Sequence, residues 1–196
     1  IGGNMAKLDK TYPTLDCAMC VLSPKMVEVK KEENIELIAN AEIMEISGYV
    51  GNFKIKVKKK PRFVKEEECV SCGNCALACP VKIPDEFNQN MGKRRAIYIP
   101  FPQAIPNSYL IDRENCLYFK TGGCRLCEKK CENNAIDFDQ NEEIIELDVG
   151  AIILATGARI FDARRKKSYG YGRYRNVVTN LDFERILNAD GPTRGK

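Results

Sequence analysis

Eight of the ten cysteines in the chain fall into two closely spaced runs, and this spacing constrains the fold more than any other feature. In the first run, gaps of two, two and three residues separate four cysteines and a proline follows, which is the spacing of bacterial ferredoxins. In the second run the gaps are seven, two and three residues, and Glu132 stands where the proline is usual. Each run supplies four thiolates, the number that one 4Fe–4S cluster needs. The spacing therefore predicts two clusters and one-electron transfer, with these iron ligands: Cys69, Cys72, Cys75, Cys79, Cys116, Cys124, Cys127 and Cys131.

The spacing also predicts how the ligands are shared between the clusters. Three cysteines separated by two residues let one tight loop cover three iron corners, whereas the fourth points away and ligates the other cluster in two-cluster ferredoxins. Small or polar residues between the first ligands, Ser71, Gly73 and Asn74, suit backbone N–H groups turned towards sulfur, which tune the reduction potential. We expect Cys69, Cys72, Cys75 and Cys131 on one cluster, and Cys116, Cys124, Cys127 and Cys79 on the other.

Other uses of cysteine fit this pattern less well. Zinc sites take two separated CxxC pairs or add histidine, and the chain contains no histidine. A non-enzymatic, zinc-stabilised interaction module is the alternative from a different functional class. A disulfide framework suits small secreted domains, and the sequence shows no signal peptide.

Composition narrows the class of protein further. Hydrophobic residues make up 44% of the chain and charged residues 30%, which is typical of one or two globular domains. No stretch approaches the roughly 18 to 20 apolar residues of a membrane helix, and the net charge of +4 is too small to indicate nucleic-acid binding. Oxygen-sensitive clusters and many thiols favour a reducing cytoplasm. No acid–base catalytic residue is predicted, because electron transfer through clusters needs none.

The segments on either side of the cysteine runs have α/β character. The first segment carries a basic stretch, residues 54–65, with seven lysines and arginines. It is either a solvated strand face or a docking surface for an acidic electron partner. In the first segment we predict a helix over 25–31 that starts at Ser23-Pro24, a strand over 35–39, and a hairpin of 41–46 with 53–57. In the second segment we predict strands over 144–148 and 151–155. A helix should then run from a capping box at Thr179 to Ala189 and bury Phe183, Ile186 and Leu187.

The cysteine segment itself contains an internal repeat. In each half an aromatic and apolar strand, 62–65 or 109–112, precedes a cysteine loop. Residues 135–138 are expected to pair with Phe63-Val64, and the inner strands to pair likewise. The long, proline-rich connection between the two runs contains a predicted strand over 96–99.

Two glycine-containing stretches and several longer matches carry a family resemblance. The stretch 149–157, VGAIILATG, resembles the strand-plus-ATG motif of two-dinucleotide-fold flavoproteins, and Ile1-Gly2-Gly3 is similar to their GG after the ribose-binding acidic residue. With 1–20, 23–29, 96–106, 169–176 and both cysteine runs, the chain resembles the family of heterodisulfide reductase A subunits of methanogens and related anaerobes. The resemblance implies an α+β fold in which a two-cluster ferredoxin-like module, residues 62–139, is inserted into part of a thioredoxin-reductase-like, FAD-binding α/β domain, residues 1–61 and 140–196.

The resemblance also implies a function. In that family an FAD splits electron pairs between a disulfide substrate and low-potential ferredoxin, and a partner subunit cleaves the CoB–CoM heterodisulfide. Electron partners would be other heterodisulfide reductase subunits, a hydrogenase or ferredoxin. The FAD-side positions would be Gly2, Gly3, Ala155, Thr156 and Gly157, and the glycine-rich phosphate loop would precede residue 1, so we expect the chain to be an internal fragment. Another flavoprotein with an inserted ferredoxin module, of the glutamate synthase small-subunit type, is the alternative within redox chemistry.

The remaining two cysteines, Cys17 and Cys20, form a CxxC pair. Three interpretations are open. They ligate a further cluster together with cysteines from outside the chain, they form a redox-active dithiol, or they are buried or idle thiols. Two cysteines alone cannot complete a four-iron cluster.

Overall fold

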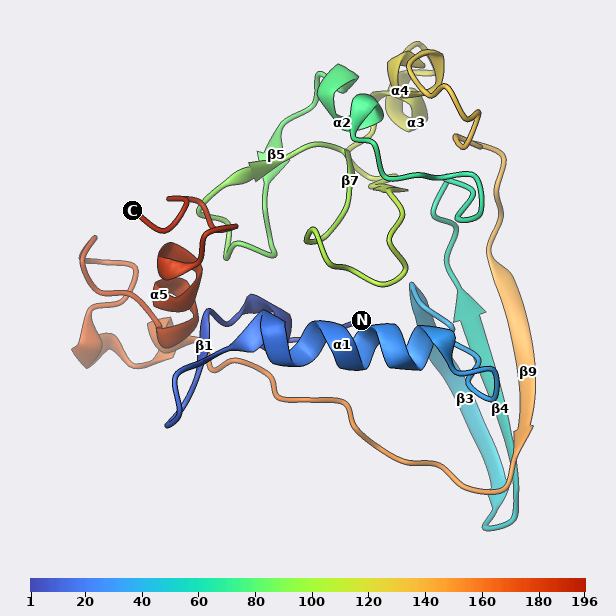
Figure 1. Ribbon diagram of the computed structural model, residues 1–196, viewed down its shortest axis with the longest axis horizontal. Helices are drawn as coiled ribbons and strands as arrows, with labels where there is room; N and C mark the ends of the chain where they lie inside the picture. Colours follow the sequence, from blue (N-terminus) through green and yellow to red (C-terminus); the bar gives the residue numbers. More distant parts are fainter. The chain divides into compact units, whose positions relative to one another are not determined.

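The computed structural model describes residues 1–196, whose helices and strands are drawn in Figure 1. The chain divides into two compact units. Unit 1 comprises Ile1, residues 29–83 and residues 95–155. Unit 2 comprises residues 2–28, 84–94 and 156–196. Both units are therefore assembled from separate stretches of chain, and both cysteine runs lie in unit 1.

A three-stranded antiparallel sheet forms one part of unit 1. Its strands are β3 (Ala41–Tyr49), β4 (Asn52–Lys59) and β9 (Glu143–Val149), in the order β3-β4-β9. The predicted hairpin and the strand over 144–148 are confirmed. Alternation along β4 buries Ile55 and Val57 and leaves the lysines between them on the opposite face.

Short elements around the cysteines form the cluster module of unit 1. The helices are α2 (Asn74–Ala78), α3 (Leu117–Thr121) and α4 (Leu126–Lys129), and β7 (Ile97–Tyr98) pairs with β8 (Leu110–Ile111). The predicted contact between the outer strands is confirmed as an antiparallel bridge between Val64 and Ile136. A core of apolar side chains and cysteines fills the module, including Phe63, Ile111 and Phe138.

Unit 2 is mostly irregular. It contains 3-10 helices η1 (Met5–Lys7), η2 (Ala163–Arg165) and η3 (Lys167–Tyr169), strands β1 (Lys10–Thr11) and β2 (Asp16–Cys17), and helix α5 (Asn180–Leu187). Helix α1 (Ala18–Lys31) begins in unit 2 and ends in unit 1, and strands β5 (Ile83–Pro84) and β6 (Lys93–Arg94) form a hairpin at the other boundary. None of the helices combines the length and the apolar character that crossing a membrane requires.

Two predicted strands and one predicted helix start in the flanking segments were wrong. Helix α1 contains the predicted helix over 25–31 and ends with it at Lys31, but it begins at Ala18 instead of Ser23-Pro24, so Ser23 is not its cap and Pro24 lies inside it. The burial of Ala18 and Met26 on one helix face offsets the hydrogen bond that Pro24 cannot donate. Residues 35–39 and 151–155 form no strand, because no neighbouring strand pairs with them, and Ile153 and Leu154 are exposed.

Helix α5 follows the predicted start but not the predicted face. Thr179 accepts a hydrogen bond from the Asp182 N–H and the Asp182 carboxylate accepts one from Thr179, which confirms the capping box. The helix ends at Leu187, and Leu181, Glu184 and Arg185 are buried instead of Phe183 and Leu187. Glu184 and Arg185 are buried because each of them binds backbone or side-chain partners in other segments of unit 2.

Candidate metal centres

Four cysteines line the first of two cavities in the cluster module. Three of them, Cys69, Cys72 and Cys75, come from the first run, and Cys131 is the last cysteine of the second run. The cavity, including its open mouth, measures about 360 Å³. Its other lining residues include Tyr109.

The second cavity has the reciprocal composition. Cys116, Cys124 and Cys127 come from the second run, and Cys79 is the last cysteine of the first run. This cavity measures about 320 Å³ and its remaining lining is apolar. The structure therefore brings the eight sulfur atoms together in the two groups of four that the spacing predicts, although their role as iron ligands stays a prediction.

Local backbone geometry explains how each run surrounds its cavity. Gly73 adopts a left-handed conformation, with φ of 87°, directly before helix α2, and this turn brings Cys72 and Cys75 to the same cavity. Helix α2 packs against α4, which carries Cys127. The last cysteine of each run lies at the cavity of the other run. A cluster bound in either cavity would therefore link the two halves of the module.

Backbone N–H groups point towards several of the cysteine sulfurs. The Ala135 N–H donates to Cys131 Sγ at 3.3 Å, and the N–H groups of Ala76 and Glu128 donate to Cys75 and Cys127. Such donors stabilise negative charge on thiolate and on a cluster. These donors differ from the small residues of the first run, Ser71, Gly73 and Asn74, so the expectation for those residues stays a prediction.

Burial dominates the protonation of the innermost thiols. It raises the pKa of Cys75 to about 12 and that of Cys127 to about 12, against the opposing effect of the N–H donors. The pKa of Cys116 is also raised, chiefly by burial. These residues are therefore thiols at neutral pH until a metal displaces the proton.

The geometry fits a cluster better than a single ion. Nowhere in the chain do three histidine, cysteine, aspartate or glutamate side chains converge closely enough to hold one metal ion. The four sulfurs of each group instead stand around a cavity, which suits a cluster with four separate iron corners. A tetrahedral zinc site needs all four ligands on one centre, so the zinc alternative is not favoured.

Sequence reasoning did not predict two features of the cluster module. The aromatic rings of Phe63, Tyr118, Phe119 and Phe138 contact one another: Tyr118 and Phe138 are stacked with ring centroids 4.0 Å apart, and the other pairs are tilted or edge-to-face. Arg62 is buried, donates from Nη2 to the Ser108 carbonyl at 2.9 Å and lies 3.4 Å from the Glu66 carboxylate. The four aromatic residues all lie close in sequence to a cysteine of one of the runs, which is the signal that could have found them.

The predicted FAD-side positions are only partly brought together. In unit 2, Asn4 donates to the Ala158 carbonyl at 2.7 Å, which joins the segment after Gly2 and Gly3 to the segment after Gly157. All three glycines have positive φ, and no atom stands within 4 Å of a Cβ added at Gly3 or Gly157. Such exposed backbone suits a close ligand contact. Without the predicted strand over 151–155, however, the residues present are an incomplete fit to FAD.

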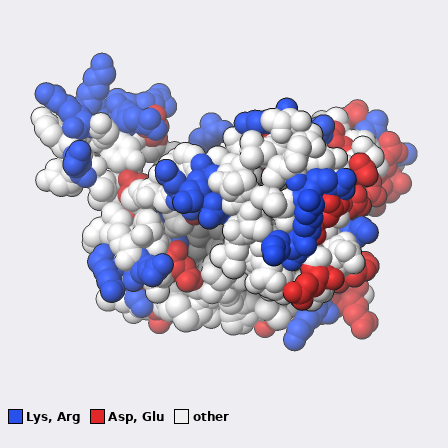
Figure 2. Space-filling view, turned by 90° about the horizontal axis from the view of Figure 1, so that it is seen from above, with Lys and Arg blue, Asp and Glu red and all other residues white.

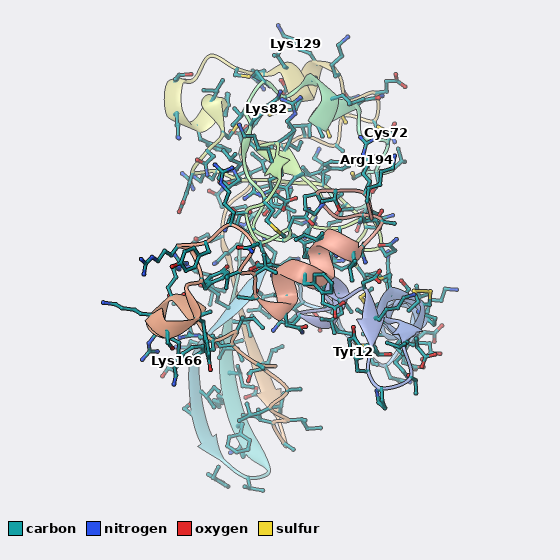
Figure 3. The ribbon with its side chains drawn as sticks, turned by 90° about the vertical axis from the view of Figure 1, so that its left-hand side faces the viewer. Tyr12, Cys72, Lys82, Lys129, Lys166 and Arg194 are labelled. Atoms are coloured by element: carbon teal, nitrogen blue, oxygen red, sulfur yellow. A yellow bond between two sulfur atoms is a disulfide. The ribbon has the colours of Figure 1, made fainter.

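The CxxC pair lies at the start of helix α1. Cys17 and Cys20 are joined by a disulfide, drawn in yellow in Figure 3, with their Cα atoms 5.2 Å apart. The Cys20 N–H donates to Cys17 Sγ at 3.2 Å, and Cys20 is exposed. The pair is therefore accessible, and its role stays a prediction.

Acidic neighbours neutralise much of the basic stretch 54–65. Lys56 lies 3.2 Å from Glu45 on β3 and 3.9 Å from Glu146 on β9. Lys54, Lys58 and Lys60 likewise pair with Asp148, Glu142 and Glu42. This favours the solvated strand face over the docking surface as the meaning of the stretch.

Fold and cavities together define an iron–sulfur module of the ferredoxin-like class. In agreement, the 4Fe-4S binding domain family matches residues 63–85, which contain the whole first run. Binding of a 4Fe–4S cluster is therefore supported independently of the cavities.

The chain is also similar over its full length to larger proteins. It is 52% identical over 196 residues to the A subunit of the H(2):CoB-CoM heterodisulfide,ferredoxin reductase of Methanothermobacter marburgensis. It is 53% identical to the second iron-sulfur A subunit of the CoB--CoM heterodisulfide reductase of Methanopyrus kandleri. In both comparisons all of this chain is matched, but it spans only 29% of the relative. The resemblance is confirmed: the whole chain is homologous to a segment of the heterodisulfide reductase A subunits.

Proposed function

We propose that the chain is the electron-transfer part of an FAD/iron–sulfur oxidoreductase of the heterodisulfide reductase A-subunit type. The supporting observation is the sorting of eight cysteines into two cavities, with one cysteine exchanged between the runs. When bound there, two 4Fe–4S clusters supply one-electron carriers. Within the chain, the thiolates would hold the iron, and backbone N–H groups such as that of Ala135 would stabilise the negative charge.

The full-length protein carries further proposed features. Residues 62–139 would be the inserted module, and 1–61 and 140–196 the two parts of the FAD-binding domain, with Gly2, Gly3, Ala155, Thr156 and Gly157 facing the flavin. The Asn4–Ala158 hydrogen bond and the open glycines support this placement. A full-length protein that is purified without flavin would refute it.

The names of the relatives support a proposed substrate and proposed partners. The protein of Methanosarcina mazei, 47% identical, is named as the A subunit of a ferredoxin:CoB-CoM heterodisulfide reductase. We propose that this chain likewise exchanges electrons with ferredoxin, a hydrogenase or other reductase subunits, and that a partner subunit cleaves the heterodisulfide. The glutamate-synthase-like alternative is not favoured, because the relatives match the whole chain. Cys17 and Cys20 are proposed to act as a redox dithiol or as ligands of a further cluster.

Replacing single cysteines tests whether the two runs exchange one ligand each. The anaerobically prepared protein should hold about eight irons per chain, and loss of one cluster should leave about four. Cys79→Ala should remove the same electron paramagnetic resonance signal as Cys116→Ala. Cys131→Ala should remove the same signal as Cys69→Ala.

Cys17→Ala is a matched control, because Cys17 lies outside both cysteine runs and its replacement should leave both electron paramagnetic resonance signals unchanged. If Cys79→Ala instead loses the signal that Cys69→Ala loses, the exchanged pairing is wrong. A colourless protein that carries zinc would refute the proposed electron-transfer function.

A further inference from the structure

The mouths of the two cavities differ in charge. Glu68 and Glu132 line the first cavity, Glu67 is exposed beside them, and none of these carboxylates has an ion-pair partner. Val70 also lines this cavity and is 67% exposed. The first mouth therefore combines an exposed apolar residue with an acidic border.

The elements that line the second cavity carry unpaired lysines instead. Lys82 follows Val81, Lys120 lies in the helix that begins at Leu117, and Lys129 ends the helix that begins at Leu126. With Lys130 directly after that helix, these residues form the lysine rim: Lys82, Lys120, Lys129 and Lys130. All four are exposed and none has an ion-pair partner.

An apolar surface lies within this rim. Leu117 and Leu126 line the second cavity and are 37% and 44% exposed, respectively. Arg125 is the only other basic residue in helices α3 and α4 or at their ends, and Glu128 neutralises it at 2.6 Å. Figure 2 views the molecule from above, and Lys and Arg side chains form several separate groups there, with Asp and Glu beside some of them. Figure 3 shows Lys82 and Lys129 in the same upper part of the module.

We propose that the lysine rim docks an acidic electron-transfer protein over the second cavity. The proposal rests on the proposed function and adds which of the two cavities faces the soluble partner. Unpaired surface charges of one sign steer an oppositely charged partner and raise the association rate. A small apolar contact bordered by charges suits a short-lived electron-transfer complex, because such complexes bury little area. The acidic border of the first cavity would repel the same partner.

Charge reversal at the rim provides the test, in the full-length, cluster-loaded protein. The probe is a plant-type ferredoxin of net negative charge, used in a redox-inert, gallium-substituted form for binding and in its reduced iron form for electron transfer. Lys82→Glu combined with Lys129→Glu should weaken binding of the gallium form at low salt by about tenfold or more. The salt dependence should flatten, because fewer charges remain to be screened.

The matched control makes the same change of charge elsewhere. Lys166→Glu combined with Lys167→Glu alters two exposed lysines of unit 2 that have no ion-pair partner, and should leave binding within about twofold. Iron content and cluster spectra should be unchanged in both variants, which shows that each one folds. Equal loss in the control, unchanged binding in the rim variant, or no binding by the unaltered protein would overturn the inference. Rim-dependent binding without electron exchange would uphold the docking inference and refute the proposed function.

Discussion

Gly73 lies between two cysteines of the first run in a backbone conformation that glycine adopts without strain. Its φ is 87° and its ψ is −10°, and helix α2 begins directly after it. A Cβ added at this position would lie 3.4 Å from the Tyr109 hydroxyl, so space is adequate and the backbone conformation is the constraint. At the scale of one residue, this turn sets the position of Cys75 relative to Cys72.

We predict that Gly73→Ala destabilises the cluster module. A left-handed conformation costs an L-residue about 1–2 kcal/mol, so the free energy of unfolding, measured by thermal denaturation, should fall by that amount. The amount of iron bound in the first cavity should fall as well. Gly123→Ala is the matched control, because Gly123 also adjoins a cysteine but has no positive φ and meets only an ordinary contact at 3.8 Å. Equal effects of the two variants would show that the conformation of Gly73 is not limiting.

Among the elements, helix α5 holds together segments of unit 2 that are distant in sequence. Its Glu184 accepts hydrogen bonds from the N–H groups of Asp9 and Lys10, at 2.8 and 3.3 Å. Arg185 donates to Asn88 Oδ1 at 2.9 Å and to the Lys7 carbonyl at 3.2 Å, and its guanidinium lies 4.8 Å from the Phe87 ring centroid. Because Arg185 is only 2% exposed, these partners replace part of the water that it loses, and its Nη2 is buried without a hydrogen-bond partner.

Replacing this side chain should release the hairpin between β5 and β6. Arg185→Met keeps apolar bulk but removes two hydrogen bonds from a charged donor, at a cost of about 2–3 kcal/mol. Hydrogen exchange in residues 84–94 should therefore accelerate. Arg175→Met, at an exposed position with no polar partner, should leave this exchange unchanged. Slower or unaltered exchange in Arg185→Met would contradict the role assigned to the buried arginine.

The contrast between helix α5 and the cysteine runs shows what the sequence could predict. The cysteine spacing is local, so it indicated which sulfurs meet, and alternation along residues 53–57 indicated the strand and its buried face. The inner face of α5 could not be predicted, because burial of Glu184 and Arg185 depends on partners more than 90 residues away. Residues 151–155 have the composition of a buried strand, but a strand requires a neighbouring strand that local sequence cannot supply.

Across the whole molecule, the two units differ in what stabilises them. The cluster module of unit 1 consists of helices of four or five residues and strands of two residues, which are too short to be stable alone. Cysteines make up part of its core, including Cys75, Cys116 and Cys127. Metal binding should therefore contribute directly to the folding of this module, whereas strands β3, β4 and β9 have seven to nine residues and pair along their lengths, with one register shift between Ile43 and Glu45.

We predict that removing the iron unfolds the cluster module selectively. A ligand at one hundred times its dissociation constant contributes about 2.7 kcal/mol, so amide protection in residues 62–83 and 95–139 should fall at least about a hundredfold after anaerobic chelation. Hydrogen exchange read by mass spectrometry measures this, with the three-stranded sheet as the internal control because its ladder does not involve the cysteines. Equal loss in sheet and module would show that the clusters stabilise unit 1 as one cooperative body. Unchanged protection in the module would mean that its short elements hold without metal, contrary to the account given of their length.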